Sequence, residues 1–263
     1  MEDSEDKERV EIKDIDSLDN IKDNHYSMGQ KFLSEFIGCF FLLFIGSGVG
    51  VYTQGQIVPV VLANGFVVGA LIYIFGRISG AHFNPSVSIP MYLAGKITFF
   101  ELFYYTLAQL SGGFLGSLFV ALCNKGKFDK LSSTQIGDYL IYYDKNKEGE
   151  TKEADIDFWS YMSAFLCEFF LTFLLVMVVF ASTVKKNNFN NLTGLIIGVT
   201  LIMLIFTGFY LSGGSLNPVR SIPPAAYEAI FGDKPKAIKQ IWIYIIGPIS
   251  GGVLASIVSI YFS

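Results

Sequence analysis

Long stretches of this 263-residue chain carry no charged side chain, and this limits its possible folds more than any other feature. Residues 36–76 contain no Asp, Glu, Lys or Arg. Of the 42 charged residues, 29 lie in just two segments, 1–31 and 125–157. A soluble domain spreads charge over its whole surface, at about a quarter of its residues, whereas only 16% are charged here. The chain is therefore predicted to be an integral membrane protein.

The composition also excludes several functional classes. A nucleic-acid partner would need a basic face, and the net charge is −4. A disulfide framework is not expected, because Cys39, Cys123 and Cys167 all lie within apolar runs. The sequence contains no pattern of a nucleophile with its base, nor of metal ligands, so neither an enzyme nor a cofactor is expected.

Six segments meet the length that a helix needs to cross a bilayer, which is about 20 mostly apolar residues. Two of them lie within 36–76, separated near Gln54, Gly55, Gln56 and Pro59. The other four are residues 102–124, 158–184, 189–210 and 240–263.

Two further apolar segments, 78–95 and 211–230, are too short and too broken to cross. Each contains Asn-Pro, and asparagine is a favoured helix N-cap while proline suits the first helical turn. In a soluble protein each segment would be a simple turn between helices. Irregular backbone at membrane depth is tolerated only where it is buried or lines a cavity. Each segment is therefore predicted to be a re-entrant half-helix.

An internal repeat relates the two halves of the chain. Residues 79–86, SGAHFNPS, align with residues 212–219, SGGSLNPV, at an offset of 133. Glu35 and Glu168 share this offset, and one Ser-Gly-Gly triplet follows later in each half, at residues 111–113 and 250–252, with an offset of 139. Each half holds three crossings, so the second copy enters the membrane upside down relative to the first. The two Asn-Pro helices then enter from opposite faces and meet near the middle.

These features resemble the aquaporin (major intrinsic protein) family. The resemblance rests on the tandem Asn-Pro boxes, their Ser-Gly-x-x-x-Asn-Pro context, the Glu-Phe pairs and Arg220, over about residues 30–263. It implies an all-α membrane fold of six transmembrane helices and two re-entrant half-helices in an inverted repeat. It also implies a homotetramer in the lipid bilayer that passes water and small neutral solutes.

The resemblance divides the chain into an acidic cytoplasmic tail, predicted to be disordered, at 1–31 and a channel domain at 32–263. Within that domain, repeat 1 covers about 32–123, an extracellular loop 124–157, and repeat 2 about 158–263. Lys and Arg residues divide almost equally between the two sides, so the cytoplasmic position of the termini rests on the resemblance alone.

The two boxes are the first candidate site. They comprise Asn84, Pro85 and Ser86, and Asn217, Pro218 and Val219. Two helix N-termini that meet would place about half a positive charge each at the middle of the membrane, which repels cations and protons. We expect each asparagine to cap its helix with the side-chain oxygen and to point its amide NH2 into the pore.

Arg220, Glu35, Glu168 and His82 complete the polar candidates. An arginine at membrane depth is costly, so Arg220 is predicted to line the pore rather than to reach an interface. The resemblance makes Glu35 and Glu168 acceptors for the re-entrant loops; the alternative is a proton relay. For His82, pore lining and simple packing remain equally open.

By the spacing of the family, Asn64, Ile205 and Gly214 form the selectivity filter with Arg220. Strict water channels resemble one another in carrying an aromatic residue and a histidine at the first two positions, so this opening should be wider. This chain has Ile205, Gly214 and Arg220 in the filter, and its two boxes end in Ser86 and Val219. In these features it resembles the plant nodulin-like intrinsic proteins, which pass boric acid. Ser221 fits water channels instead. We therefore predict passage of water and of solutes the size of glycerol, urea or boric acid; the alternatives are a strict water channel and, more distantly, a secondary carrier.

Overall fold

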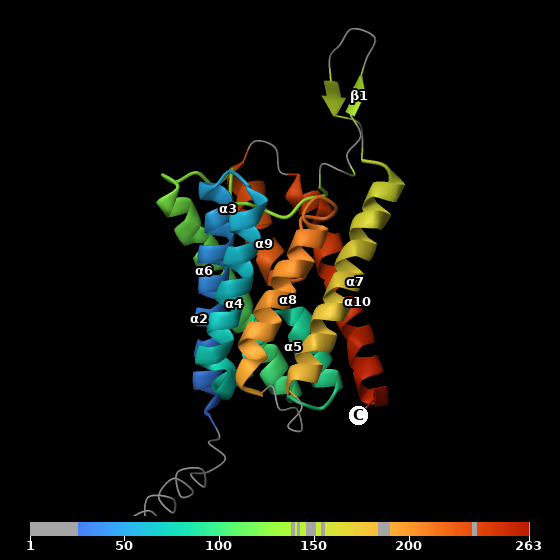
Figure 1. Ribbon diagram of the computed structural model, residues 1–263. Coiled ribbons are helices and arrows are strands. Elements are labelled where there is room, and N and C mark those ends of the chain that lie inside the picture. Colours follow the sequence, from blue (N-terminus) through green and yellow to red (C-terminus); the bar gives the residue numbers. More distant parts are fainter. Residues whose placement is uncertain are drawn as a thin grey trace, which may run out of the picture.

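The structure is a computed structural model, and it shows a bundle of helices that run roughly parallel to one another (Figure 1). The described residues are 26–137, 140, 143–145, 151–153, 156–183, 190–232 and 236–262. Residues 1–25 of the expected tail lie outside them. Within the described part, the only strands are β1 (Tyr143–Lys145) and β2 (Thr151–Glu153), an antiparallel pair in the long loop. The expected all-α membrane fold is confirmed.

Five of the six expected crossings are helical segments that are long and apolar enough to span a bilayer. They are Met28–Tyr52, α4 (Ile57–Ser79), α6 (Phe99–Cys123), α7 (Phe158–Thr183) and α10 (Ala237–Phe262). The first begins at Met28, so residues 28–31 belong to the helix and not to the tail. The chain breaks after it at residues 53–56, as expected, whereas Pro59 lies in the first turn of α4.

The first crossing is not a uniform α-helix. It consists of α2 (Met28–Phe41), a π-helical turn η1 (Leu42–Ser47) and α3 (Gly48–Tyr52). Such π turns carry an extra residue within a helix and are frequent at functional sites. Leu42, in this turn, lines the central cavity described below.

The remaining crossing, which is the fifth along the chain, is shorter than predicted. A 3-10 turn η2 (Asn190–Leu192) leads into α8 (Thr193–Gly208), whose 16 residues span about 24 Å. The expected helix covered 189–210. In the bundle α8 packs against α4 and α7 (Figure 1).

The two re-entrant segments are half-helices, α5 (Pro85–Leu93) and α9 (Pro218–Phe231). We call the end of the bundle that holds residue 26 and Phe262 the tail end, and the end that holds Cys123 and Phe158 the loop end. α5 occupies the tail-end half and α9 the loop-end half, and they start near the middle of the bundle (Figure 1). This confirms the inverted repeat and excludes a simple turn at either Asn-Pro.

The Ser-Gly-Gly triplets lie where helices touch backbone to backbone. A Cβ atom at Gly112 would lie 2.1 Å from the carbonyl oxygen of Phe36, and one at Gly251 would lie 2.1 Å from that of Phe169. The pair α2 and α6 therefore packs as the pair α7 and α10 does, which is the structural counterpart of the sequence repeat.

Glycines also bring α4 and α8 together. A Cβ atom at Gly198 would lie 2.7 Å from the carbonyl oxygen of Gly65. We expect Gly198→Leu to cost about 1–3 kcal/mol, because the new side chain overpacks this contact. Thermal unfolding in detergent measures the loss. Gly29→Ala is the control, since its Cβ would meet nothing nearer than the Ser27 oxygen at 3.9 Å. Equal melting temperatures for the two variants would contradict the prediction.

Candidate functional site

The two loops that lead into the half-helices share an unusual backbone. Three residues in each have positive φ, a region that costs roughly 1–2 kcal/mol for residues other than glycine. The angles are 86°, 53° and 50° at Gly80, Ala81 and Phe83, and 82°, 60° and 57° at Gly213, Gly214 and Leu216. Backbones of this kind persist only where surrounding contacts hold them.

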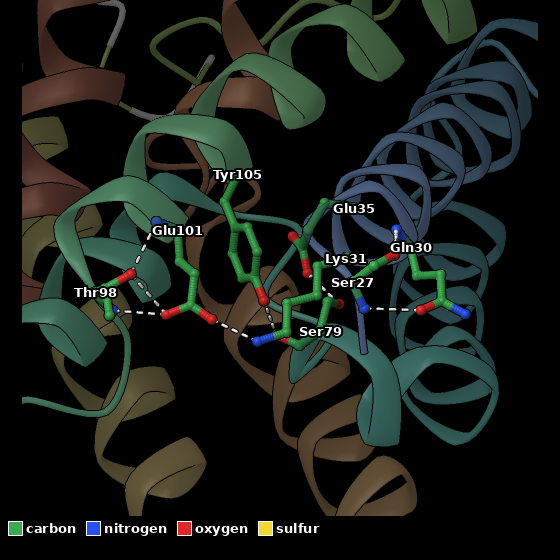
Figure 2. A network of polar contacts seen from close by, with 8 residues as sticks. All are labelled: Ser27, Gln30, Lys31, Glu35, Ser79, Thr98, Glu101 and Tyr105. Atoms are coloured by element: carbon green, nitrogen blue, oxygen red, sulfur yellow. Dashed lines mark hydrogen bonds and ion pairs between the residues drawn. The ribbon is translucent and has the colours of Figure 1, made fainter. Parts of the chain in front are cut away.

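Glu35 provides those contacts in the first loop. Its Oε1 accepts a hydrogen bond from the Ser79 hydroxyl at 2.6 Å and one from the backbone N–H of His82 at 2.9 Å. Its Oε2 accepts from the N–H of Phe83 at 2.7 Å. The Glu35 side chain points at Ser79 from α2 (Figure 2).

Glu168 repeats this arrangement in the second loop. It accepts from Ser212 at 2.7 Å, from the N–H of Ser215 at 2.9 Å and from the N–H of Leu216 at 2.7 Å. Glu35 and Glu168 are fully buried, and neither lines the cavity. Their contacts are those of structural acceptors, not of a proton relay along a pore.

Two tyrosines complete the loops, and the sequence reasoning missed both. The Tyr105 hydroxyl donates to the carbonyl of Ser79 at 2.7 Å (Figure 2), and the Tyr244 hydroxyl donates to that of Ser212 at 2.7 Å. The two tyrosines are 139 residues apart, the same offset as the Ser-Gly-Gly triplets. This spacing was a signal that could have found them.

The two box asparagines each bind their own helix and the opposite loop. The Oδ1 of Asn84 accepts from the N–H of Ser86 at 2.8 Å, and that of Asn217 accepts from Val219 at 2.9 Å. The Nδ2 of Asn84 donates to the Leu216 carbonyl at 2.8 Å. The predicted caps are present. The hydrogen bond across the repeat, which uses one amide hydrogen, was not predicted.

The Nδ2 of Asn217 donates in the same way, to the carbonyl of Phe83 at 2.9 Å. The two asparagines therefore cross-link the two loops at the middle of the bundle. One amide hydrogen of each remains for the cavity, which both line.

A cavity of about 760 Å³ runs through this part of the bundle. The four residues predicted to form the filter, Asn64, Ile205, Gly214 and Arg220, are all among the residues that line it. His82 and both box asparagines line it as well. The other box residues are buried but do not line it; they are Pro85, Ser86, Pro218 and Val219.

Two residues of the predicted filter lie in tight surroundings. Gly214 has a φ of 60°, and a Cβ atom there would lie 3.1 Å from the Cα of Ile205. Both the backbone and the neighbour therefore favour glycine. The Asn64 amide turns back onto its own helix and donates to the Val60 carbonyl at 2.8 Å.

Arg220 is buried, with 7% of its surface exposed, and its Nη1 donates to the carbonyl of Ser132 at 2.7 Å. It does not reach an interface in the way a snorkelling arginine would. Its partner belongs to the long loop, which the sequence analysis left without a role. Residues 131–137 of that loop fold into the loop end, with Leu131 and Ile136 buried.

His82 combines the two interpretations that the sequence left open. Its ring lines the cavity and also packs edge-to-face on Tyr105, with ring centroids 5.2 Å apart. Its Nδ1 lies 3.1 Å from the Ser88 hydroxyl oxygen.

An ion pair at the tail end of the cavity was not predicted. The Lys31 ammonium, in the first turn of α2, lies 2.5 Å from the Glu101 carboxylate, in the first turn of α6. Glu101 is held in turn by a capping box with Thr98 (Figure 2). Both charged side chains line the cavity.

Comparison with known proteins identifies the family. The sequence model described as "Major intrinsic protein" matches residues 22–259. The chain belongs to the major intrinsic protein family. A relative named "Glycerol uptake facilitator protein-like 6", from Lactiplantibacillus plantarum, is 34% identical over 86% of this chain and 95% of its own length.

Other relatives in the family carry aquaporin names. "Aquaporin AqpM" from Methanothermobacter marburgensis is 32% identical, over 88% of this chain and 96% of its own. "Aquaporin NIP3-1" from Arabidopsis thaliana is 30% identical, over 93% and 73% respectively. The crystal structure of the aquaglyceroporin from Plasmodium falciparum superposes with a TM-score of 0.70 at 24% identity, over 88% of this chain and 94% of that one, and so shows the shared fold.

Proposed function

We propose that the protein is a passive channel for water and for small uncharged polar solutes of the size of glycerol, urea or boric acid. The observation that carries this is the cavity between the two half-helices, lined by both box asparagines and by Arg220. The relatives support it, since they include a protein named as a glycerol facilitator and several named aquaporins.

The electrostatics of the cavity explain how such a channel would exclude cations. The N-termini of α5 and α9 each contribute a partial positive charge of about 0.5 where they meet. Arg220 adds a full charge close by, in a site buried from solvent. A cation that left water for this region would be repelled from three sides, whereas a neutral solute would not.

The filter explains why a solute larger than water would pass. Gly214 contributes no side chain, and Ile205 and Asn64 add neither an aromatic ring nor a charge. Arg220 would supply hydrogen bonds to a passing hydroxyl or amide. Such a filter would be wider than one that carries an aromatic residue and a histidine, and it would have one strong donor group.

The membrane arrangement is part of the proposal. We propose that the termini face the cytoplasm, that the loop at 124–157 faces outside and that four copies assemble. Both described ends of the chain lie at the tail end, opposite the long loop (Figure 1). This supports a shared side for the two termini, and protease digestion of sealed vesicles would assign that side.

Stopped-flow light scattering of proteoliposomes tests the solute range. We expect water, glycerol, urea and boric acid each to cross faster than in protein-free liposomes of the same lipid. Water flux without uptake of any of the three solutes would support the strict water channel and contradict the wide filter.

A further inference from the structure

We propose that Glu228, a buried carboxylate of α9 that does not line the cavity, is a positioning residue for Arg220 and thereby sets the ratio of solute to water passage. The inference rests on the proposed channel function. It concerns a residue that does not line the cavity and that acts through residues 131–133 of the long loop.

Glu228 binds the loop on both sides of the residue that holds the arginine. With only 8% of its surface exposed, it accepts from the backbone N–H of Leu131 at 3.1 Å and from the Ser133 hydroxyl at 2.5 Å. Between these two residues lies Ser132, whose carbonyl accepts the 2.7 Å hydrogen bond from Arg220. The two glutamate oxygens therefore bracket the acceptor.

The contacts of Glu228 and Arg220 with the loop form a closed ring of interactions that includes α9. Glu228 and Arg220 are eight residues apart on this helix, so about two helical turns separate them. The ring runs from Arg220 to Ser132, along the loop to its bracketing neighbours, across to Glu228 and back through α9. Movement of the loop relative to the helix would break one of these links.

The backbone of the bracketed residue needs such support. Ser132 has a φ of 55°, a left-handed conformation that serine rarely adopts. Its side chain also packs tightly against α3, where a Cβ atom at Gly50 would lie 2.2 Å from the Ser132 hydroxyl oxygen. Without the bracket, Ser132 would relax, and its carbonyl would turn away from the guanidinium.

Other ties of the same loop lie beyond the bracket. The Thr134 and Ser221 hydroxyl oxygens are 2.5 Å apart, and Gln240 accepts from the N–H of Ile136 at 2.8 Å. These contacts fasten the following residues to α9 and α10 but do not enclose Ser132. They provide a matched comparison for the effect of loosening the loop in general.

Loss of the bracket is expected to move the Arg220 side chain toward the cavity. A buried guanidinium that loses an acceptor seeks another polar environment, because an unpaired charge away from water is costly. Arg220 lines the cavity, so this space is within its reach. The side chain would then occupy part of the opening, and solutes larger than water would be hindered most.

Proteoliposomes that carry Glu228→Ala test this. We expect the ratio of glycerol to water permeability to fall about fivefold, the effect of roughly one lost hydrogen bond on a barrier, and water permeability per channel to fall about twofold. The ratio does not depend on how much protein folds. Gln240→Ala, which releases the loop outside the bracket, is expected to keep the wild-type ratio.

The double variant with Arg220→Ala shows whether the arginine is the intermediate. In that background Glu228→Ala should change neither the ratio nor the water permeability. An unchanged ratio in the single variant, or an equal fall with and without the arginine, would overturn the proposal. If the wild-type channel passes water alone, the solute part of the proposed function fails, and the same pair of variants read by water permeability still tests Glu228.

Discussion

Replacing Asn64 with Phe and Ile205 with His together is expected to reduce glycerol permeability at least about tenfold, a barrier increase of about 1.4 kcal/mol, while water continues to pass. Both positions line the cavity together with Gly214 and Arg220. Larger rings at two walls of this opening leave space for water but not for a three-carbon solute.

The measurement is the same stopped-flow assay, with water and glycerol gradients applied to one preparation. Leu62→Phe is the matched control, because it adds an aromatic ring to α4 on its exposed outer face. It should leave both permeabilities unchanged. Glycerol flux that survives the double substitution would show that the constriction lies elsewhere.

Glu168→Ala is expected to be strongly destabilising. It leaves the N–H groups of Ser215 and Leu216 and the Ser212 hydroxyl without their buried acceptor. The loop also loses the contacts that hold its three positive φ angles. We expect a loss of about 3–5 kcal/mol, or a fall of about 10 °C in melting temperature.

Thermal unfolding in detergent provides the readout. Glu168→Gln keeps one acceptor oxygen and should fall between the wild type and the alanine variant. Glu101→Gln removes a partly exposed carboxylate at the tail end of the cavity. We expect it to shift the melting temperature by less than about 3 °C. An alanine variant at 168 as stable as the wild type would contradict the structural role.

The repeat explains why much of the site could be predicted. Landmarks at one offset predicted that Glu35 and Glu168 would occupy equivalent places, and their hydrogen bonds agree to within about 0.1 Å. Short-range chemistry predicted the asparagine caps, because Asn-Pro fixes a helix start locally. These features depend on residues close in sequence or on duplicated patterns.

The features that were missed depend on contacts between distant segments. No periodicity in the loop indicates that the carbonyl of Ser132 meets Arg220, 88 residues away. The crossing of each asparagine amide to the opposite loop depends on how closely two half-helices approach. Similarly, the π turn at Leu42–Ser47 arises within an uncharged run and carries no local signal.

The temperature and concentration dependence of glycerol flux tests the central claim, a passive pore, most directly. The account predicts flux through proteoliposomes that rises linearly with the gradient and has an activation energy close to that of diffusion in water. A flux that saturates with glycerol concentration and has a high activation energy would show a carrier cycle, and would contradict a continuous pore between α5 and α9.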